Sequence, residues 1–412
     1  SQDIQVNGRS VIDITMEPDM SSLEEVVVVG YGLEVDKKDL TGSVAKADLD
    51  HALGTSNVSI IQALQGAIPG LNVGAVTNAG QNPTISVRAQ NTLSSEASDN
   101  APLIVLDGII YRGNIIDINP SDIKSVEVLK DVSSAAIYGS QASNGVIVIT
   151  TKGRSVISKP TFNYTMSHSI QAPSNQFTPM RADEYEGFYR DIFWAEGSRI
   201  GPDYLEEDPN YDLTANMKSL EIVNGYMDGL DTRWWDLFTG NGHTTNHNLS
   251  VQGGGESSSY FISGGYTDQA AFIEGDTYKR YNLRINLETD ITDWMKIGTQ
   301  TFVSVGDYSG VDPGPDVIFQ AQPWAPIYDD QGEIIAQPDG SWINPYLRLN
   351  REDVDIDVNL SSVLFTQIKL PINGLTYRLN YANNYRTTDR RFFDPNANNF
   401  TGLAWLNVHT HL

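Results

Sequence analysis

The chain has 412 residues, with 27 lysines and arginines against 52 aspartates and glutamates, and no cysteine. The formal net charge of −25 argues against nucleic acid as a partner, because phosphate binding needs a basic surface. Without cysteine, the chain cannot form disulfides, cysteine-ligated zinc sites or a thiol nucleophile.

The N-terminal region offers two extended segments. Ser10–Met16 reads as one strand that Pro18 ends, and one strand cannot form a domain. Four consecutive valines then follow two carboxylates and lead into Gly30. Valine has a stiff side chain and a high strand preference, so this run is either a buried strand or a segment that adds to a sheet edge of another protein. It comprises Leu23, Glu24, Glu25, Val26, Val27, Val28 and Val29.

Residues from about 36 to 154 alternate short apolar runs with glycine-, asparagine- and proline-rich turns. Asn57 can cap a helix that Pro69-Gly70 ends. Short strands are predicted after it, because each apolar run is only a few residues long and is bounded by turn residues. They cover Leu71–Val73, Thr84–Arg88 and Leu103–Gly108.

The segment Ile118–Arg154 is the most informative part of the chain, because it packs four elements into one small unit. Apolar and polar residues alternate in its first part, which predicts a strand with one solvent-facing side. β-branched residues crowd its last part, which predicts burial on both faces. In order, we expect a strand over residues 125–128, a helix after Asp131 and Ser133 that Gly139 closes, an Asn144-Gly145 turn and a buried strand Val146–Thr151.

Beyond about residue 160 the hydrophobic pattern has period two, which indicates roughly seven or eight strands. A soluble antiparallel sandwich would alternate in the same way. Transmembrane β-strands also show only about ten residues of alternation, so the lack of a long apolar run leaves a membrane barrel open. The clearest runs are Phe162–Ile170, Asn248–Gln252, Tyr281–Leu287 and Tyr377–Tyr381.

The phrases VEVLKD, AAIYGS and NGVIVITTKG resemble the end of the plug domain of TonB-dependent outer-membrane transporters. PGLNV and LIVLDG match the order of that domain, and the VLKD ending is similar to the SusC branch. Ser86-Val87-Arg88-Ala89 departs from the family's usual Arg-Ile-Arg-Gly. NLSVQGG and YFISGGY are similar to the first barrel hairpins of SusC-type proteins.

The resemblance implies a mainly β fold, a small α+β plug domain followed by antiparallel strands of a transmembrane β-barrel. The family barrel has about 22 strands, more than residues 160–412 supply, so we expect the N-terminal portion of a longer protein or completion by another chain. The implied domains are residues 1–22, the last strand of a carboxypeptidase-D-like regulatory domain; 23–35, the TonB-box region; 36–154, the plug; and 160–412, the first part of the barrel with extracellular loops.

Site residues follow from the matched motifs. The TonB box is placed on Leu23–Val29, and the plug motif on Arg88, Asp107, Gly108, Glu127, Lys130, Asp131, Tyr138, Gly139, Asn144 and Gly145. Trp234, Trp235, Trp324 and Trp342 lie between strands, where they could stack on sugar rings or peptide side chains, or pack within their own loops. His243 and His247 sit on a predicted strand and lack the glutamate of a helical zinc motif, so we expect no metal site.

The resemblance further implies TonB-dependent active import of an oligosaccharide, glycan or oligopeptide across the outer membrane of a Gram-negative bacterium. Implied partners are a SusD-like lipoprotein, TonB with its inner-membrane ExbB/ExbD motor, outer-membrane lipid and a dimer of the transporter-lipoprotein pair. No cofactor and no enzymatic activity are expected. The alternatives are a TonB-dependent siderophore or cobalamin-type receptor and a soluble β-rich carbohydrate-binding or hydrolytic protein.

Overall fold

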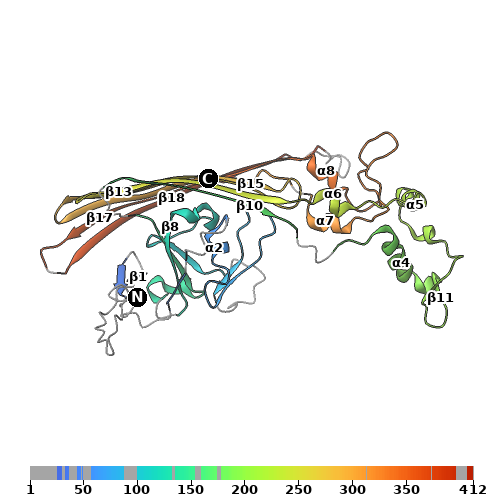
Figure 1. The fold of residues 1–412 in the computed structure, drawn as a ribbon, viewed down its shortest axis with the longest axis horizontal. Coiled ribbons are helices and arrows are strands. Elements are labelled where there is room, and N and C mark those ends of the chain that lie inside the picture. The colour runs from blue at the N-terminus through green and yellow to red at the C-terminus, as the bar shows by residue number, and fades with distance from the viewer. Residues whose placement is uncertain are drawn as a thin grey trace, which may run out of the picture.

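The computed structural model describes residues 26–29, 33–36, 44–47, 49, 57–87, 100–131, 135–153, 159–173, 178–311, 313–372, 374–395 and 406–411. Three parts stand out in Figure 1: a long β-sheet, a compact unit that lies against one face of it, and a group of short helices beyond one end of the strands. We call them the wall, the plug and the loop unit.

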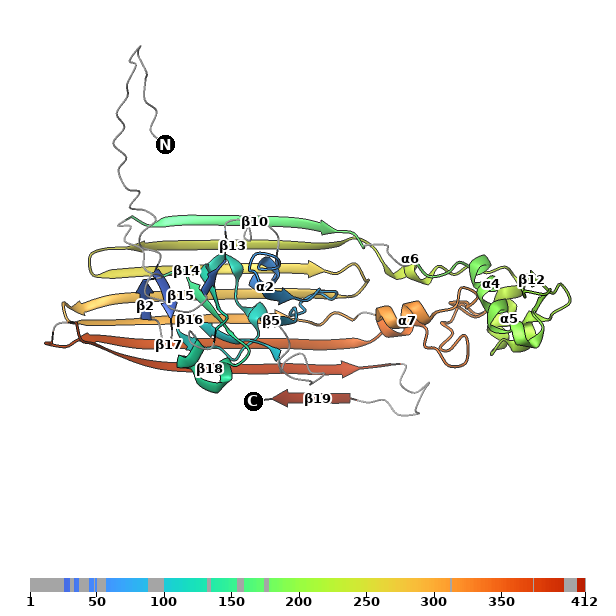
Figure 2. The same cartoon turned by 90° about the horizontal axis from the view of Figure 1, so that it is seen from below.

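The wall is an eight-stranded meander in which every strand is antiparallel to the next one along the sheet, as Figure 2 shows. This confirms the seven or eight strands predicted from period two. Its strands are β10 (Thr161–Gln171), β13 (Gly242–Gly254), β14 (Ser258–Ala270), β15 (Thr277–Thr292), β16 (Met295–Asp307), β17 (Glu352–Lys369), β18 (Thr376–Phe393) and β19 (Leu406–His411).

The two faces of the wall are inverted relative to a soluble sheet. On β15, Leu283 is 47% exposed and faces away from the plug, whereas the neighbouring Arg284 is 2% exposed and faces it. The same alternation exposes Phe162, Tyr164, Leu249, Tyr281, Leu287, Tyr377, Leu379 and Tyr381. A contiguous apolar outer face of this extent suits lipid better than water, and it argues against the soluble β-rich alternative.

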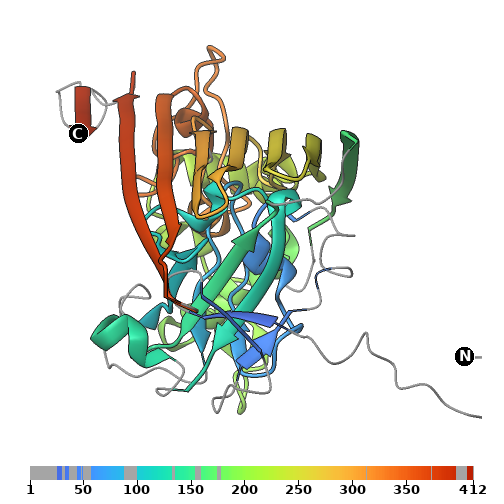
Figure 3. The ribbon, with the colours of Figure 1, turned by 90° about the vertical axis from the view of Figure 1, so that its left-hand side faces the viewer.

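The plug is built on a five-stranded sheet with the order β3-β8-β9-β6-β7. These strands are β3 (Val44–Lys46), β6 (Leu103–Leu106), β7 (Ile109–Ile110), β8 (Ile123–Leu129) and β9 (Val146–Thr151). Around the sheet lie the hairpin β4 (Leu71–Val73) and β5 (Ile85–Val87), the helix α2 (Ile60–Ala63), and the 3-10 turns η4 (Ile115–Asp117), η5 (Pro120–Asp122) and η6 (Ala136–Ala142). Figure 3 shows this unit within the curve of the wall.

Apolar layers cover both faces of the central plug strands. Val126 and Val128 pack on one side with α2, while Leu129, Val146 and Val148 pack on the other with η6. The prediction of a solvent-facing side on the strand over 125–128 is therefore wrong at Glu127, which is 1% exposed. A local alternation could not reveal this, because the second cover is formed by a later segment of the chain.

The start of α2 also differs from the prediction. Ser59, not Asn57, caps it: the Ser59 Oγ accepts from the Ile61 amide, and the Gln62 side chain accepts from the Ser59 amide. The helix ends at Ala63, well before Pro69-Gly70. Two other turn predictions hold, since Gly139 interrupts η6 with φ 67° and Gly145 has φ 88°, both in the left-handed region that glycine enters easily.

The valine run forms a hairpin within the chain. β1 (Val26–Val29) pairs antiparallel with β2 (Leu33–Asp36), with Val28 opposite Glu34. Leu23, Glu24 and Glu25 lie outside the described residues. Within the part of the chain that the structure describes, no helix combines the length and apolarity needed to cross a membrane.

The loop unit comprises residues 178–240, between β10 and β13, and residues 313–350, between β16 and β17. Its helices are α4 (Ala182–Ile192), α5 (Leu220–Met227), α6 (Trp234–Phe238), α7 (Pro315–Gln320) and α8 (Pro345–Leu349), with 3-10 turns η7 (Trp194–Glu196) and η8 (Leu213–Asn216) and the short hairpin β11 (Arg199–Ile200) and β12 (Glu206–Glu207). It has a core of its own, formed mainly by aromatic side chains.

Candidate functional site: the interface of plug and wall

Buried polar side chains of the wall hold the plug in place. Asn286 of β15 donates to the Thr151 hydroxyl at 3.1 Å and to the Lys152 carbonyl at 2.7 Å. Between β14 and β15, the Asp276 carboxylate accepts from the Ala79 amide at 3.0 Å. Buried polar groups normally find such partners, because an unmade hydrogen bond costs about 1–3 kcal/mol.

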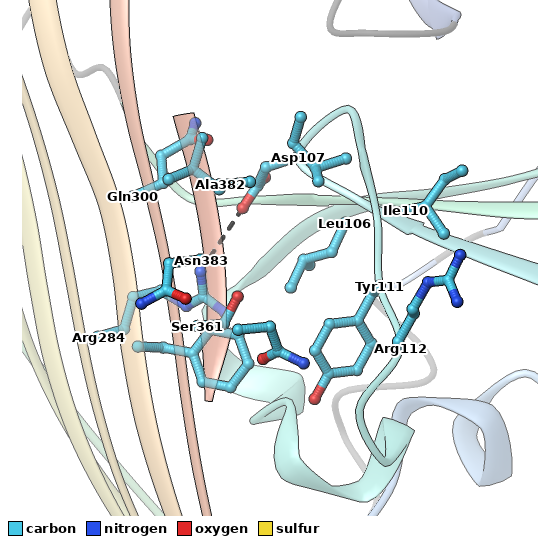
Figure 4. Close-up of a pocket in the computed structure, with 14 residues that line it drawn as sticks. Leu106, Asp107, Ile110, Tyr111, Arg112, Arg284, Gln300, Ser361, Ala382 and Asn383 are labelled. Carbon is cyan, nitrogen blue, oxygen red and sulfur yellow. Dashed lines mark ion pairs between the residues drawn. The ribbon is translucent and has the colours of Figure 1, made fainter. Parts of the chain in front are cut away.

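Arg284 on β15 is the centre of this interface. Its guanidinium lies 3.5 Å from the Asp107 carboxylate and 3.6 Å from that of Asp122, and all three side chains are almost fully buried. Figure 4 shows the ion pair with Asp107. The guanidinium also lies over the Phe302 ring, 4.9 Å from its centroid. One buried cation thus ties two separate plug segments to the wall.

Asp107 is presented by a tight turn. It has φ 50° and is followed by Gly108 with φ 86°, which places an Asp-Gly pair in the left-handed region between β6 and β7. The Asp107 carboxylate accepts from the Thr151 amide and from the Thr151 hydroxyl, each at 2.8 Å. The carboxylate is therefore positioned by the plug before it meets Arg284.

Arg280, four residues before Arg284 on the same face of β15, binds backbone carbonyls rather than carboxylates. Its guanidinium donates to the carbonyl of Val58 at 3.0 Å, to the carbonyl of Ile116, and to the Thr267 hydroxyl at 3.2 Å. The bonds to Val58 and Ile116 join the residue before the cap of α2 and the turn η4 to β15, while the bond to Thr267 holds the guanidinium to the neighbouring wall strand.

A third contact lies on β17. The Asn359 amide donates to the Tyr111 hydroxyl at 2.7 Å and to the Asp117 carboxylate at 2.9 Å. Burial raises the pKa of the Asp117 carboxyl, while the bond from Asn359 acts in the opposite direction. Burial also raises the pKa of the Tyr111 hydroxyl, which therefore stays protonated.

Asp117→Asn is expected to flatten the pH dependence of plug docking. Because the pKa of Asp117 lies above its ordinary value of 3.8 in the docked plug, this group favours docking at low pH, and that contribution is lost as pH rises through the raised pKa. Thermal unfolding of the full-length protein between about pH 4 and pH 8 measures the slope. Asp293→Asn, at an exposed turn, is the control; equal slopes in wild type and D117N would contradict the assignment.

A cavity of about 180 Å³ lies between the β6–β7 turn and the wall, beside the ion pair of Asp107 and Arg284 (Figure 4). Its lining combines the charged ends of Asp107, Arg112 and Arg284 with Gln300. The turn that carries Asp107 therefore does not fill the whole space in front of the wall.

The predicted plug-motif residues divide into two groups. Asp107 and Gly108 reach the interface, and Asp107 makes the ion pair with the wall. The others lie within the plug: Glu127 and Tyr138 are buried, the Lys130 ammonium donates to the Pro69 carbonyl, the Asn144 amide lies 3.5 Å from the Ala101 carbonyl, Asp131 follows β8, and Gly139 and Gly145 shape turns. Arg88 lies outside the described residues.

The wall residues of the interface were missed by sequence reasoning. Arg280 and Arg284 occupy inward positions of a strand whose outward positions are Tyr281, Leu283 and Leu287. The sequence does contain a signal for these residues. When arginines alternate with the apolar residues of such a strand, they mark the face that cannot lie in lipid.

The predicted tryptophans lie in the loop unit. Trp234, Trp324 and Trp342 are buried in its core, where Trp324 meets Tyr185, Tyr189 and Tyr226 edge to face. Of the two interpretations that the sequence left open, packing is the one that this burial favours for these three. Trp235 is half-buried and borders a cavity of about 160 Å³.

Trp324→Ala is expected to destabilise the loop unit by about 3–5 kcal/mol, because it empties the centre of an aromatic cluster. Limited proteolysis of the purified full-length protein should then cut within residues 178–240 much faster. Trp194→Ala is the matched control, since Trp194 is 49% exposed whereas Trp324 is 2% exposed. Equal cleavage of the two variants would show that Trp324 does not organise this unit.

Comparisons with known proteins agree with this architecture. The profile of the TonB-dependent receptor plug domain matches residues 36–146. TonB-dependent receptor P3 of Formosa agariphila is 34% identical over 367 residues, covering 86% of this chain and 33% of the relative. TonB-dependent receptor SusC of Bacteroides thetaiotaomicron is 30% identical over 334 residues, covering 78% of this chain and 30% of the relative.

A solved structure shows the same fold. The RagAB peptide importer in its 'open-open' state superposes with a TM-score of 0.72 at 24% identity, over 90% of this chain and 43% of that chain. The present chain spans about a third of the length of the curated relatives that it matches. With a matched plug, an inverted wall and these relatives, the chain belongs to the SusC-like TonB-dependent transporters.

Proposed function

We propose that the whole protein imports a large nutrient, an oligosaccharide or an oligopeptide, across an outer membrane by TonB-dependent active transport. The observation that carries the proposal is the plug held by buried polar contacts against the inner face of a wall whose outer face is apolar. Such a plug would block passage at rest and could be released, because many of the contacts described between it and the wall are polar, beside apolar contacts at Phe302 and Tyr278.

The connections between strands suggest an orientation. Short turns join β13 to β14, β15 to β16 and β17 to β18 at one end, and both segments of the loop unit lie at the other. Outer-membrane barrels have short periplasmic turns and longer extracellular loops. The loop unit would then face outward, where a SusD-like lipoprotein delivers substrate, and Trp235 is our candidate for substrate contact there.

On the periplasmic side, TonB would engage residues 23–29 and pull on the plug, using energy from the inner-membrane motor. We assign residues 23–35 to the TonB-box region, 36–154 to the plug and 160–412 to the barrel. A strand that adds to a sheet edge binds mainly through main-chain hydrogen bonds, so its side-chain identities matter little. A valine-rich segment suits this role because valine favours the extended conformation.

Uptake screening with the full-length locus tests the proposal. Cells that carry it are supplied with neutral oligosaccharide and oligopeptide mixtures, with and without TonB, and depletion of each mixture is measured. We expect depletion of one mixture that depends on TonB. Depletion that persists unchanged without TonB would overturn the proposal, and absence of a co-purifying lipoprotein would favour the siderophore-type alternative.

A further inference from the structure

The side chains on the outer face of the wall change in character along the strands. The strand register places outward side chains of neighbouring strands side by side, in rungs that cross the sheet. Towards the loop unit, three successive rungs are apolar, rich in aromatic rings, and polar. The first comprises Tyr164, Leu249, Gly264, Leu283 and Val303, the second Met166, His247, Tyr266, Tyr281 and Val305, and the third, which we call the polar rung, His168, Thr245, Asp268, Lys279 and Asp307.

The polar rung marks one level of the membrane. From the second rung to the short turns, every outward strand position of β10 and of β13 to β16 is described, and none of them carries a charged side chain. Lys279 and Thr289 are ten residues apart on β15. At a strand tilt of about 40°, that is about 26 Å along the membrane normal, close to the apolar band of about 25 Å in outer-membrane barrels. The polar rung therefore lies at the height of lipid headgroups.

Charges of opposite sign alternate along the polar rung. Lys279 lies directly opposite Asp268 on β14 and Asp307 on β16, yet its exposed ammonium forms no ion pair with the residues that the structure describes. Other partners hold the two carboxylates: one Asp268 oxygen lies 3.4 Å from the His243 Nε2, and Asp307 accepts from the Ser309 amide at 3.0 Å. The rung thus presents a free cation between two positioned anions.

Two tyrosines lie between these charges and the apolar rung. Tyr266 and Tyr281 follow Asp268 and Lys279 on the side of the short turns, and their ring centroids are 5.0 Å apart. Tyrosine suits the boundary between headgroups and acyl chains, because its ring is apolar and its hydroxyl is polar. Headgroup, boundary and acyl-chain contacts are therefore stacked in one column of β14 and β15.

We propose that Asp268, Lys279 and Asp307 bind the phosphoethanolamine headgroup of a phospholipid whose acyl chains lie over the apolar rung. The Lys279 ammonium binds the phosphate, and the ethanolamine ammonium donates to Asp268 or Asp307. Two carbons separate the phosphate from the ammonium in this headgroup, a reach similar to the spacing of about 4.8 Å between neighbouring strands. The site is independent of the imported substrate and of TonB.

Charge complementarity selects this headgroup among common phospholipids. Phosphatidylglycerol would bring a phosphate but leave both carboxylates without a cation. Phosphatidylcholine carries the same charges as phosphatidylethanolamine, but its quaternary ammonium has no N–H to donate to a carboxylate. A second copy of this chain could also cover the face. It would not require the order of apolar, aromatic and polar rungs, which is the order found along one leaflet of a membrane.

Native mass spectrometry of the purified full-length protein tests the headgroup. The protein in detergent is supplied with phosphatidylethanolamine, phosphatidylcholine or phosphatidylglycerol that have identical acyl chains, and the retained lipid is counted. We expect wild type to retain phosphatidylethanolamine several-fold more than either of the other two. Equal retention of all three lipids would overturn the proposal.

Two sets of variants test the two halves of the site. Lys279→Gln should lower retention of phosphatidylethanolamine several-fold, whereas Lys369→Gln, at an exposed lysine at the opposite end of the wall, is the matched control and should not. Asp268→Asn combined with Asp307→Asn should remove the preference for phosphatidylethanolamine over phosphatidylglycerol, and it provides the test if K279Q does not fold. Unchanged retention by K279Q, or an unchanged preference in the double variant, would contradict the assignment.

The same spectra distinguish a lipid from a second copy of the chain. If the polar rung is a lipid site, K279Q loses bound lipid without changing the oligomeric mass. If K279Q instead converts a dimer into a monomer while the lipid count stays the same, the face is an interface between copies and the lipid site is overturned.

Discussion

Deletion of residues 23–29 is expected to abolish uptake while substrate binding at the cell surface stays unchanged. The segment contains β1, and the proposed TonB contact is a strand pairing that needs its backbone N–H and C=O groups. Without it, the plug keeps its contacts with Arg280, Arg284 and Asn359 and stays docked. Uptake and surface binding are measured in the same cells with the substrate class found by screening.

Substitutions within β1 test whether uptake needs the backbone pairing of this strand or is lost only because the deletion shortens the chain. Val27→Pro removes an N–H from the middle of the strand and should reduce uptake severely, whereas Val27→Thr keeps a β-branched residue and should have little effect. In the structure this strand pairs with Leu33–Asp36, so TonB would have to replace that partner. Undiminished uptake by the deletion variant would remove the TonB-box assignment.

Arg284→Met is expected to give the largest loss of plug docking among single wall substitutions. It leaves the carboxylates of Asp107 and Asp122 buried without their cation, and breaking a buried ion pair in this way costs about 3–5 kcal/mol. Burial raises the pKa of the Asp122 carboxyl, whereas the Arg284 guanidinium acts in the opposite direction. Thermal unfolding of the full-length protein and cell sensitivity to a large antibiotic report the loosened plug.

A compensated variant is the control for this experiment. R284M combined with Asp107→Asn and Asp122→Asn removes the two uncompensated charges and should recover most of the lost stability, because the penalty comes from buried charge rather than from missing volume. If the triple variant is no more stable than R284M, the ion pairs do not hold the plug and packing against Phe302 must account for the effect.

The strands of the wall could be predicted from the sequence, because the alternation that reveals them depends only on neighbouring residues. Period two places Leu283 and Arg284 on opposite faces whatever the rest of the chain does, and the structure confirms both placements. Glu127 shows the limit of the same argument. Its strand alternates, yet η6 covers the side that alternation assigned to solvent, and only the three-dimensional arrangement reveals that cover.

Half of the candidate site could be predicted from the sequence. Asp107 and Gly108 were named from the matched motif, but the strand predicted over Leu103–Gly108 is wrong at its end: β6 stops at Leu106, and Asp107-Gly108 forms a left-handed turn. Arg284, the partner of Asp107 on β15, could not be predicted, because nothing in the sequence around Arg284 identifies a carboxylate so far upstream. The tryptophans illustrate a related limit: their type and spacing fit ligand stacking and core packing equally well, and burial of Trp324 distinguishes the two.

The meander of the wall bears on the order in which the protein is built. Every wall strand pairs with the next in sequence, so the wall can grow one hairpin at a time through nearby contacts. The bond between Asn359 and Asp117 instead spans 242 residues, and such distant contacts form late because a long loop must first be closed. The plug, although synthesised first, would therefore lack this anchor until β17 is made and has paired with the wall.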